Sequence, residues 1–287
     1  MTATTLIAKS GRSRRNVFGR NSPLFVGGLV WLGAIVLLGI TGSLWYPHNA
    51  TSIDLLNPYA NPSAQHWLGT DSSGRDIFSR LIQGTIPTLL GPLLVVGFSV
   101  TLGGILAVLA SWFGGAWEAL ISRTFDILFA FPGILIAILA SAIFGAGFWA
   151  PVIALSVAYS PVLGRILKTS LDRELTLPYL SALRVQGFSS FAIIARHLVP
   201  SQLPIVAVQC AVVFSYALLD LAAISYLGLG VQEPATDWGL LVSTGQSAIL
   251  AGYPNQSIFA AVAILVTVLA LNICGDRLAR RFEIGER

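Results

Sequence analysis

The sequence predicts an all-α integral membrane protein with six transmembrane helices, and three observations lead to that fold class. Only 10% of the 287 residues are charged, whereas an ordinary soluble domain carries about 25%. Hydrophobic residues make up 55% of the chain, and its mean hydropathy is +0.77. Six apolar stretches are long enough, or nearly so, to cross a hydrocarbon core about 30 Å thick. Because these stretches are continuous runs rich in Leu, Ala and Gly, they favour a helix bundle over a β-barrel.

The apolar stretches set the order of the elements. They are expected at Leu24–Trp45, Leu89–Trp112, Ile127–Phe148, Pro151–Leu167, Ile205–Leu227 and Ile258–Cys274. The first stretch follows a basic leader but is too long for the apolar part of a signal peptide, so we expect it to be retained. The segment between the first two stretches contains several Pro, Asn and Ser residues and then a short helical pattern, so it is expected to be a loop that ends in a short helix.

The basic residues orient these helices. If the N-terminus is cytoplasmic, 15 of the 17 Lys and Arg residues fall on the cytoplasmic side, and only Arg75 and Arg80 fall outside. The basic residues follow the topology rather than forming one patch, so the net charge of +4 does not indicate nucleic-acid binding. The chain then divides into a cytoplasmic tail (1–23), a first helix (24–46), an external loop with a short helix (47–87), a five-helix core (88–276) with a cytoplasmic loop (168–203), and a cytoplasmic tail (277–287).

Small residues recur at every fourth position in two of the stretches. They are Ser99, Gly103, Ala107 and Ser111 in the second, and Gly133, Ala137, Ser141 and Gly145 in the third. Residues four apart share a helix face, and small faces let helices approach closely in lipid. We interpret them as packing seams, with a solute path as the alternative.

The chain lacks the motifs of common catalytic and cofactor sites. It contains no GxxxxGK[ST] phosphate loop, no GxSxG and no HExxH, so neither ATP binding by that loop nor hydrolase chemistry is expected. His48, His66 and His197 have no metal-ligand spacing. Cys210 and Cys274 lie within apolar stretches, where they are expected to pack rather than to bridge or ligate. We therefore expect no catalytic residue, metal or cofactor in this chain.

A polar helical segment, Tyr179–Pro200, separates two transmembrane stretches. Gly187 stands four residues after Leu183, nine residues separate it from His197, and Pro200 closes the segment. An amphipathic helix lying in the membrane interface without a partner would also explain its alternating Leu, Arg and Phe residues.

The spacing of this segment resembles the cytoplasmic loop by which importer permeases of the ATP-binding-cassette (ABC) class dock their ATPase. Ser181, Ala182 and Leu183 occupy the positions of that family's Glu-Ala-Ala signature, so the signature's acidic residue is missing here. Four further segments resemble the C-type permease subunit of dipeptide, oligopeptide and nickel ABC importers. They are Gly69–Gly84, the segment from Phe125 (FDILFAFPGILIAI), Ile224–Gly239, and the segment from Asn272 (NICGDRLARRF).

The chain is therefore identified as a member of that permease family. The resemblance implies a type I ABC importer permease fold in a bacterial-type plasma membrane, and a heterodimer with a second, homologous permease. It also implies cytoplasmic ATPase subunits, which carry the ATP and Mg²⁺, and an extracytoplasmic substrate-binding protein. The cargo expected from the resemblance is a short peptide or a related solute such as a nickel chelate, glutathione or haem.

Three groups of residues are candidates for these roles. The ATPase-coupling loop is expected to use Ser181, Ala182, Leu183, Arg184, Gly187, Phe188, His197 and Pro200, with ATPase contact at Arg184 and Phe188 in particular. Asp71, Arg75 and Asp76 form either a local salt-bridged cap or a contact with the binding protein. Asp220, deep in the fifth stretch, either hydrogen-bonds to a neighbouring helix or contacts a cationic group of the cargo.

Two other classes of protein remain as alternatives. A secondary transporter driven by an ion gradient would carry paired ionisable residues deep in its helices, whereas only Asp220 lies clearly within one. A structural membrane scaffold would not need the docking spacing.

Overall fold

The computed structural model describes residues 23–42 and 47–285. Within these residues the chain is helical apart from its loops and one isolated antiparallel bridge between Thr70 and Asp76. The helices are α2 (Pro23–Gly42), α3 (Ile77–Phe113), α4 (Gly115–Phe129), α5 (Gly133–Phe144), α6 (Trp149–Leu175), α7 (Pro178–Val185), α8 (Ser190–Ile193), a π-helical turn η1 (Ile194–Leu198), α9 (Val199–Ser201), α10 (Leu203–Tyr226), α11 (Trp238–Thr244), α12 (Gln246–Leu250) and α13 (Asn255–Gly285). The expected basic tail at 1–23 lies almost wholly outside the described residues.

Among the described residues, α2, α3, α6, α10 and α13 are each long and apolar enough to cross a membrane. Helices α4 and α5 form a bent pair with an angle of 80°, and counting that pair as one span gives six. The predicted all-α membrane fold is confirmed.

The third expected helix, Ile127–Phe148, is broken in the structure. Helix α4 ends at Phe129 and α5 begins at Gly133, with Pro132 as its extended N-cap. A proline disfavours helical backbone in the residue before it and lacks the N–H that would continue the ladder. The sequence FAFPG therefore turns the chain instead of carrying one straight helix across the membrane.

Helix α3 also differs from the expectation. It starts at Ile77, where the Asp76 side chain accepts a hydrogen bond from the Ser79 amide, and it runs for 37 residues. The short helix expected at the end of the 47–87 loop is therefore the first part of α3. Likewise α13 continues to Gly285, past the expected core boundary at 276.

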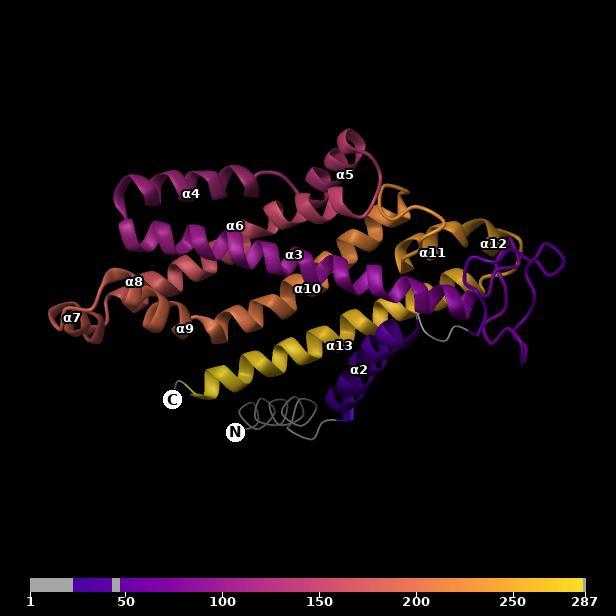
Figure 1. Ribbon diagram of the computed structural model, residues 1–287, viewed down its shortest axis with the longest axis horizontal. Helices are drawn as coiled ribbons and strands as arrows, with labels where there is room; N and C mark the ends of the chain where they lie inside the picture. The colour runs from indigo at the N-terminus through magenta and orange to yellow at the C-terminus, as the bar shows by residue number, and fades with distance from the viewer. Residues whose placement is uncertain (1–22, 43–46, 286–287) are drawn as a thin grey trace, which may run out of the picture.

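The long helices run between two structured ends of the bundle (Figure 1). At one end lie α7, α8 and α9, and we call it the α7 end. At the other end the 47–76 loop lies beside α11 and α12, and we call it the α11 end.

Helices α3 and α6 make the most extensive helix–helix interface among the described residues. A Cβ added to Gly103 would lie 2.4 Å from the Ser160 carbonyl oxygen of α6, so only glycine allows this approach. The Ser99 hydroxyl donates to the Ser156 carbonyl oxygen at 2.9 Å, and both Ser99 and Ala107 are fully buried. The small residues of α3 thus form a packing seam rather than the wall of a path.

We expect Gly103→Ala to lower the free energy of unfolding by about 1–3 kcal/mol, because the added methyl group overpacks against α6 backbone. The matched control is Gly97→Ala on the same helix, where no atom lies within 4 Å of an added Cβ. Alanine is the better helix former by up to about 1 kcal/mol, so this control should be neutral or stabilising. Thermal unfolding in detergent measures both, and equal melting temperatures would contradict the close packing.

Candidate functional site

The α7 end carries a compact block of short helices, residues 176–201, which we call the docking block. Its first helix begins at Pro178, a residue suited to a helical N-terminus, and ends at Val185, with Gln186 as its C-cap. Gly187 follows with φ +83°, and the Phe188 amide donates back to the Leu183 carbonyl oxygen at 3.2 Å. This is a glycine-dependent helix C-cap, and it turns the chain sharply after α7.

The second half of the block is a tight succession of helical turns. Ser189 caps α8 by accepting a hydrogen bond from the Ala192 amide. The π-helical turn Ile194–Leu198 then precedes α9, which contains Pro200. Since Pro200 has no N–H to donate to the Arg196 carbonyl, a wider turn at this point accommodates the interrupted ladder.

One side of the docking block is packed against the bundle. Leu180, Ile193 and Leu198 are buried in a cluster with Ala107 of α3 and Leu171 of α6. Because these apolar contacts join the block to both long helices, a force on the block is transmitted to α3 and α6.

Polar and aromatic contacts fix the block further. The Arg184 guanidinium lies 5.0 Å from the centroid of the Trp112 ring, in a cation–π contact. The Tyr179 hydroxyl donates to Glu174 at 2.5 Å. Burial and this hydrogen bond to a carboxylate raise the pKa of Tyr179 to about 12, so the phenol keeps its donor proton at neutral pH.

The other side of the block is exposed and partly apolar. Val185 is 88% exposed, Phe191 is 80% exposed and Phe188 is 41% exposed. Of the sequence-predicted residues, Ser181, Ala182, Arg184, Gly187, Phe188 and Pro200 are exposed, and Leu183 and His197 are half-buried. The sequence analysis missed Val185 and Phe191, because an apolar residue shows whether it faces the core or solvent only once the helix packing is known. Such exposed apolar side chains at one end of a bundle are typical of a protein-binding surface.

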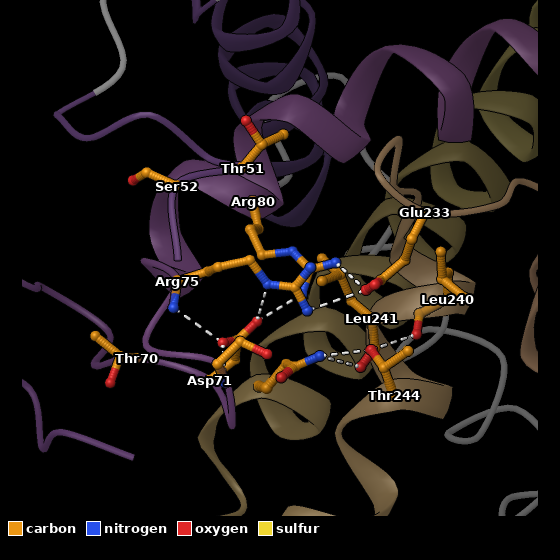
Figure 2. Close-up of polar contacts among 12 residues, drawn as sticks. Thr51, Ser52, Thr70, Asp71, Arg75, Arg80, Glu233, Leu240, Leu241 and Thr244 are labelled. Atoms are coloured by element: carbon orange, nitrogen blue, oxygen red, sulfur yellow. Dashed lines mark hydrogen bonds and ion pairs between the residues drawn. The ribbon is translucent and has the colours of Figure 1, made fainter. Parts of the chain in front are cut away.

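A charge cluster organises the α11 end (Figure 2). The Asp71 carboxylate accepts hydrogen bonds from Arg75 Nε at 2.7 Å and Arg80 Nη1 at 2.6 Å. Glu233 Oε1 accepts from the Nη2 atoms of both arginines at 3.0 Å. We call these four residues the charge clamp. It ties the start of α3 to the loop after α10, which is more than 150 residues away in sequence.

Most of the clamp is buried. Arg80 is 1% exposed and Asp71 is 2% exposed, whereas the Glu233 side chain is 43% exposed. Partial burial would raise the pKa of Glu233, but its hydrogen bonds and charge contacts with Arg75 and Arg80 outweigh burial and lower the pKa. Glu233 therefore stabilises the clamp fully above its ordinary pKa, and this contribution is lost as the pH falls through the lower folded value.

The structure places the three external candidate residues in local contacts. Asp71 and Arg75 belong to the charge clamp. The Asp76 side chain caps α3, and its Oδ1 atom lies 3.0 Å from His66 Nδ1. These contacts are those of a local salt-bridged cap, the first of the two interpretations of these residues. Contact with the binding protein stays a prediction. Arg80 and Glu233 were not singled out from the sequence, since their pairing depends on folding across 153 residues.

Asp220 has a neighbour on another helix. The Tyr159 hydroxyl of α6 donates to Asp220 Oδ2 at 2.8 Å. This is the hydrogen bond expected of a carboxylate within a membrane bundle, and contact with cargo stays a prediction.

We expect Arg80→Met to destabilise the fold by about 3 kcal/mol or more, because it leaves Asp71 buried with one cation fewer. Arg75→Met is the matched control, and its side chain is 13% exposed against 2% for Arg80, so its loss should cost less. Hydrogen exchange of residues 47–76 would report the loosened loop. Equal hydrogen-exchange rates of residues 47–76 in the two variants would contradict the conclusion that Arg80 contributes more than Arg75 to the stability of the clamp.

Comparisons with known proteins agree on one family. Residues 67–285 match the family described as "Binding-protein-dependent transport system inner membrane component". The glutathione transport system permease protein GsiD of Pectobacterium atrosepticum is 35% identical over 253 residues, which is 86% of this chain and 83% of that protein. The dipeptide transport system permease protein DppC of Alkalihalophilus pseudofirmus is 32% identical over 259 residues, which is 90% of this chain and 85% of that protein.

Solved structures share the fold. An inward-facing structure of the MetNI methionine ABC transporter matches with a TM-score of 0.57 at 19% identity, and covers 71% of this chain and 97% of that one. The residues matched by the family, 67–285, contain helices α3 to α13, the docking block and all four residues of the charge clamp. The chain therefore belongs to the inner membrane components of binding-protein-dependent transport systems, as a non-catalytic, multi-pass permease subunit of an ABC importer.

Proposed function

We propose that this chain forms half of the translocation pathway for a short peptide or a related small solute such as glutathione, together with a second, homologous permease. The relatives named for dipeptide and glutathione transport support this class of cargo. The observation that carries the mechanism is the docking block, which is packed onto α3 and α6 on one side and exposes apolar side chains on the other.

In this mechanism, an ABC ATPase binds the exposed side of the docking block, with contacts at Arg184 and Phe188. ATP binding closes the ATPase subunits, and the block acts as a rigid lever because Leu180, Ile193 and Leu198 join it to α3 and α6. The two permeases then rock between inward-open and outward-open arrangements around the path. Family membership favours this ATP-driven mechanism over transport driven by an ion gradient.

The acidic residue of the family's signature is missing from the docking block, so a charged contact with the ATPase is not available at that position. Ser181 is exposed at that position, so the block offers a hydroxyl there where the signature offers a carboxylate. The proposal rests on the shape and anchoring of the block, which the Gly187 cap supports without that acid.

The α7 end is proposed to face the cytoplasm, with both termini on that side. The positive-inside rule supports this orientation, because only Arg75 and Arg80 of the 17 basic residues belong to the 47–87 segment at the opposite end. The binding protein then docks at the α11 end, and the exposed Glu233 joins Arg75 as a candidate for its contact.

The orientation predicts opposite labelling of two exposed positions. A single cysteine at Ser189 should react with an impermeant thiol reagent only from the cytoplasmic side, and one at Ser63 only from outside. The background for both is the variant in which Cys210 and Cys274 are replaced by Ala. Labelling of both positions from the same side would contradict the six-span topology. Thr236 is unsuitable as an external site because it is 1% exposed.

Gly187→Trp should uncouple the importer. Its φ of +83° is strained for any other residue by about 1–2 kcal/mol, and the indole would stand on the surface that receives the ATPase. We expect uptake per ATP hydrolysed to fall by about tenfold, which corresponds to the loss of about 1.4 kcal/mol of coupling. The measurement is uptake and ATP hydrolysis in proteoliposomes that contain the complete transporter.

Gly145→Trp is the control for this variant. Gly145, between α5 and α6, also has a positive φ (+98°) and no atom within 4 Å of an added Cβ, and it lies outside the docking block and outside the segments that make the α11 end. It should therefore carry a similar backbone strain without affecting the ATPase contact. An unchanged ratio of uptake to hydrolysis in Gly187→Trp would contradict docking at this block.

A further inference from the structure

An exposed ion pair joins two membrane elements midway along the chain. Arg165 of α6 donates from Nη2 to Asp126 of α4, and its guanidinium lies 4.4 Å from the centroid of the Phe129 ring. The Arg165 side chain is 45% exposed and that of Asp126 is 66% exposed. A carboxylate and a guanidinium are costly to expose to lipid, so their surroundings need an explanation.

The depth of this pair follows from the packing of α3 on α6. Gly103 of α3 lies against Ser160 and Gly164, and the Phe125 ring of α4 also lies against Gly164. Arg165 and Asp126 are the next residues along α6 and α4. The ion pair is therefore level with the part of α3 around Gly103.

At this level the bundle presents two different faces. On α3, Leu102 is 39% exposed and Ile105 is 56% exposed, and they lie about 100° and 160° around the helix from Gly103 in the same direction. Their side chains suit lipid. At the same depth the α4–α6 side presents a cation and an anion, which suit water or a polar solute.

On α6 the exposed side lies away from α3. Val162, Arg165 and Thr169 lie within about 60° of one another around the helix. Arg165 and Thr169 are exposed and Val162 is half-buried, whereas Ser156, Ser160, Leu163 and Leu167 on the side toward α3 are buried. Tyr159, which donates to Asp220 of α10, lies about 120° around the helix from Arg165 and belongs to a different side of α6.

We propose that the exposed α4–α6 side around this ion pair is a wall of the solute path, and that Arg165 and Asp126 recognise the charged ends of the cargo. The inference rests on the proposed function, since a short peptide carries one carboxylate and one ammonium group. Arg165 would bind the carboxylate, and Asp126 would bind the ammonium.

The ion pair suits such an exchange of partners. When the path is empty, Arg165 and Asp126 satisfy each other's charge. When cargo passes, each finds an opposite charge on the cargo, so no unpaired ion is left in the bundle in either state. A cargo with both charges is accommodated better than one with a single charge, which makes the pair a determinant of specificity.

The first experiment tests whether water reaches the α4–α6 side at Arg165 and Asp126. Single cysteines replace Arg165, Asp126, Leu102 or Ile105 in a background without Cys210 and Cys274, within the complete transporter in proteoliposomes. The probe is a positively charged trimethylammonium methanethiosulfonate, applied with and without ATP. We expect the first two positions to react at least about tenfold faster than the two on α3, with rates that depend on ATP.

Equal rates at all four positions would overturn the proposal. So would unreactive cysteines at both Arg165 and Asp126 in both nucleotide conditions, because that result would mean that the partner permease or lipid covers the pair.

The second experiment tests recognition of charge, with the dipeptide Ala-Ala as the probe. Arg165→Gln and Asp126→Asn should each reduce its uptake by about tenfold or more, the loss expected for one charge-assisted hydrogen bond. Binding-protein-stimulated ATP hydrolysis should be retained. Arg165→Gln should leave uptake of the amide of Ala-Ala unchanged, since that probe has no carboxylate. Asp172→Asn, which removes another ion-pair partner on α6, is the control and should transport normally.

The double variant, Asp126→Asn with Arg165→Gln, separates recognition from structure. It leaves no unpaired ion, so it would relieve a purely structural pair, and full uptake of Ala-Ala in this variant would overturn the proposal. If the unmodified transporter takes up no Ala-Ala, the proposed cargo class fails, while the labelling experiment still decides whether the face lines a path.

Discussion

The close approach of α3 and α6 is the constraint on which the rest of the structure depends. Lipid gives no hydrophobic drive between helices, so their association needs tight contact, and Gly103 and Gly164 provide it by removing side chains from the crossing. The Phe125 ring then fills the space beside Gly164 and seats α4. The ends of the same two helices hold the docking block through Leu167 and Ala107. One helix pair thus carries both the bundle and the docking block.

Two ion clusters in the bundle differ in their burial. At the α11 end, Arg80 is buried between Asp71 and Glu233, which fixes the outer loops on α3. Farther along the bundle, Arg165 pairs with Asp126 on the face away from the α3 crossing. The first arrangement is enclosed and suits a structural role, whereas the second is exposed and suits exchange with a charged solute. The difference in burial, rather than in residue type, separates the two roles.

Hydropathy and motif spacing predicted the fold class and the place of the docking block between α6 and α10. The six expected spans agree with the structure when the bent α4–α5 pair is counted as one span. These properties depend on residues close together in sequence, such as the Gly187 cap four residues after Leu183. The break at Pro132 and the length of α3 were not predicted, because apolar composition alone does not reveal where a helix bends or how far it extends beyond lipid. The pairing of Arg80 with Glu233 and the exposure of Val185 were also not predicted, since both depend on contacts between distant segments.

In the proposed mechanism the docking block and the α3–α6 pair move as one rigid unit, and a single intrachain distance reports whether they do. Spin labels at Val185 on α7 and Phe98 on α3, both exposed, would report the intrachain distance in the complete transporter. If the unit is rigid, the distance distribution is the same without nucleotide and with ATP trapped on the ATPases, while labels on the two permeases move relative to each other. A shift of the intrachain distance between the two states would contradict rigid coupling of the docking block to α3 and α6.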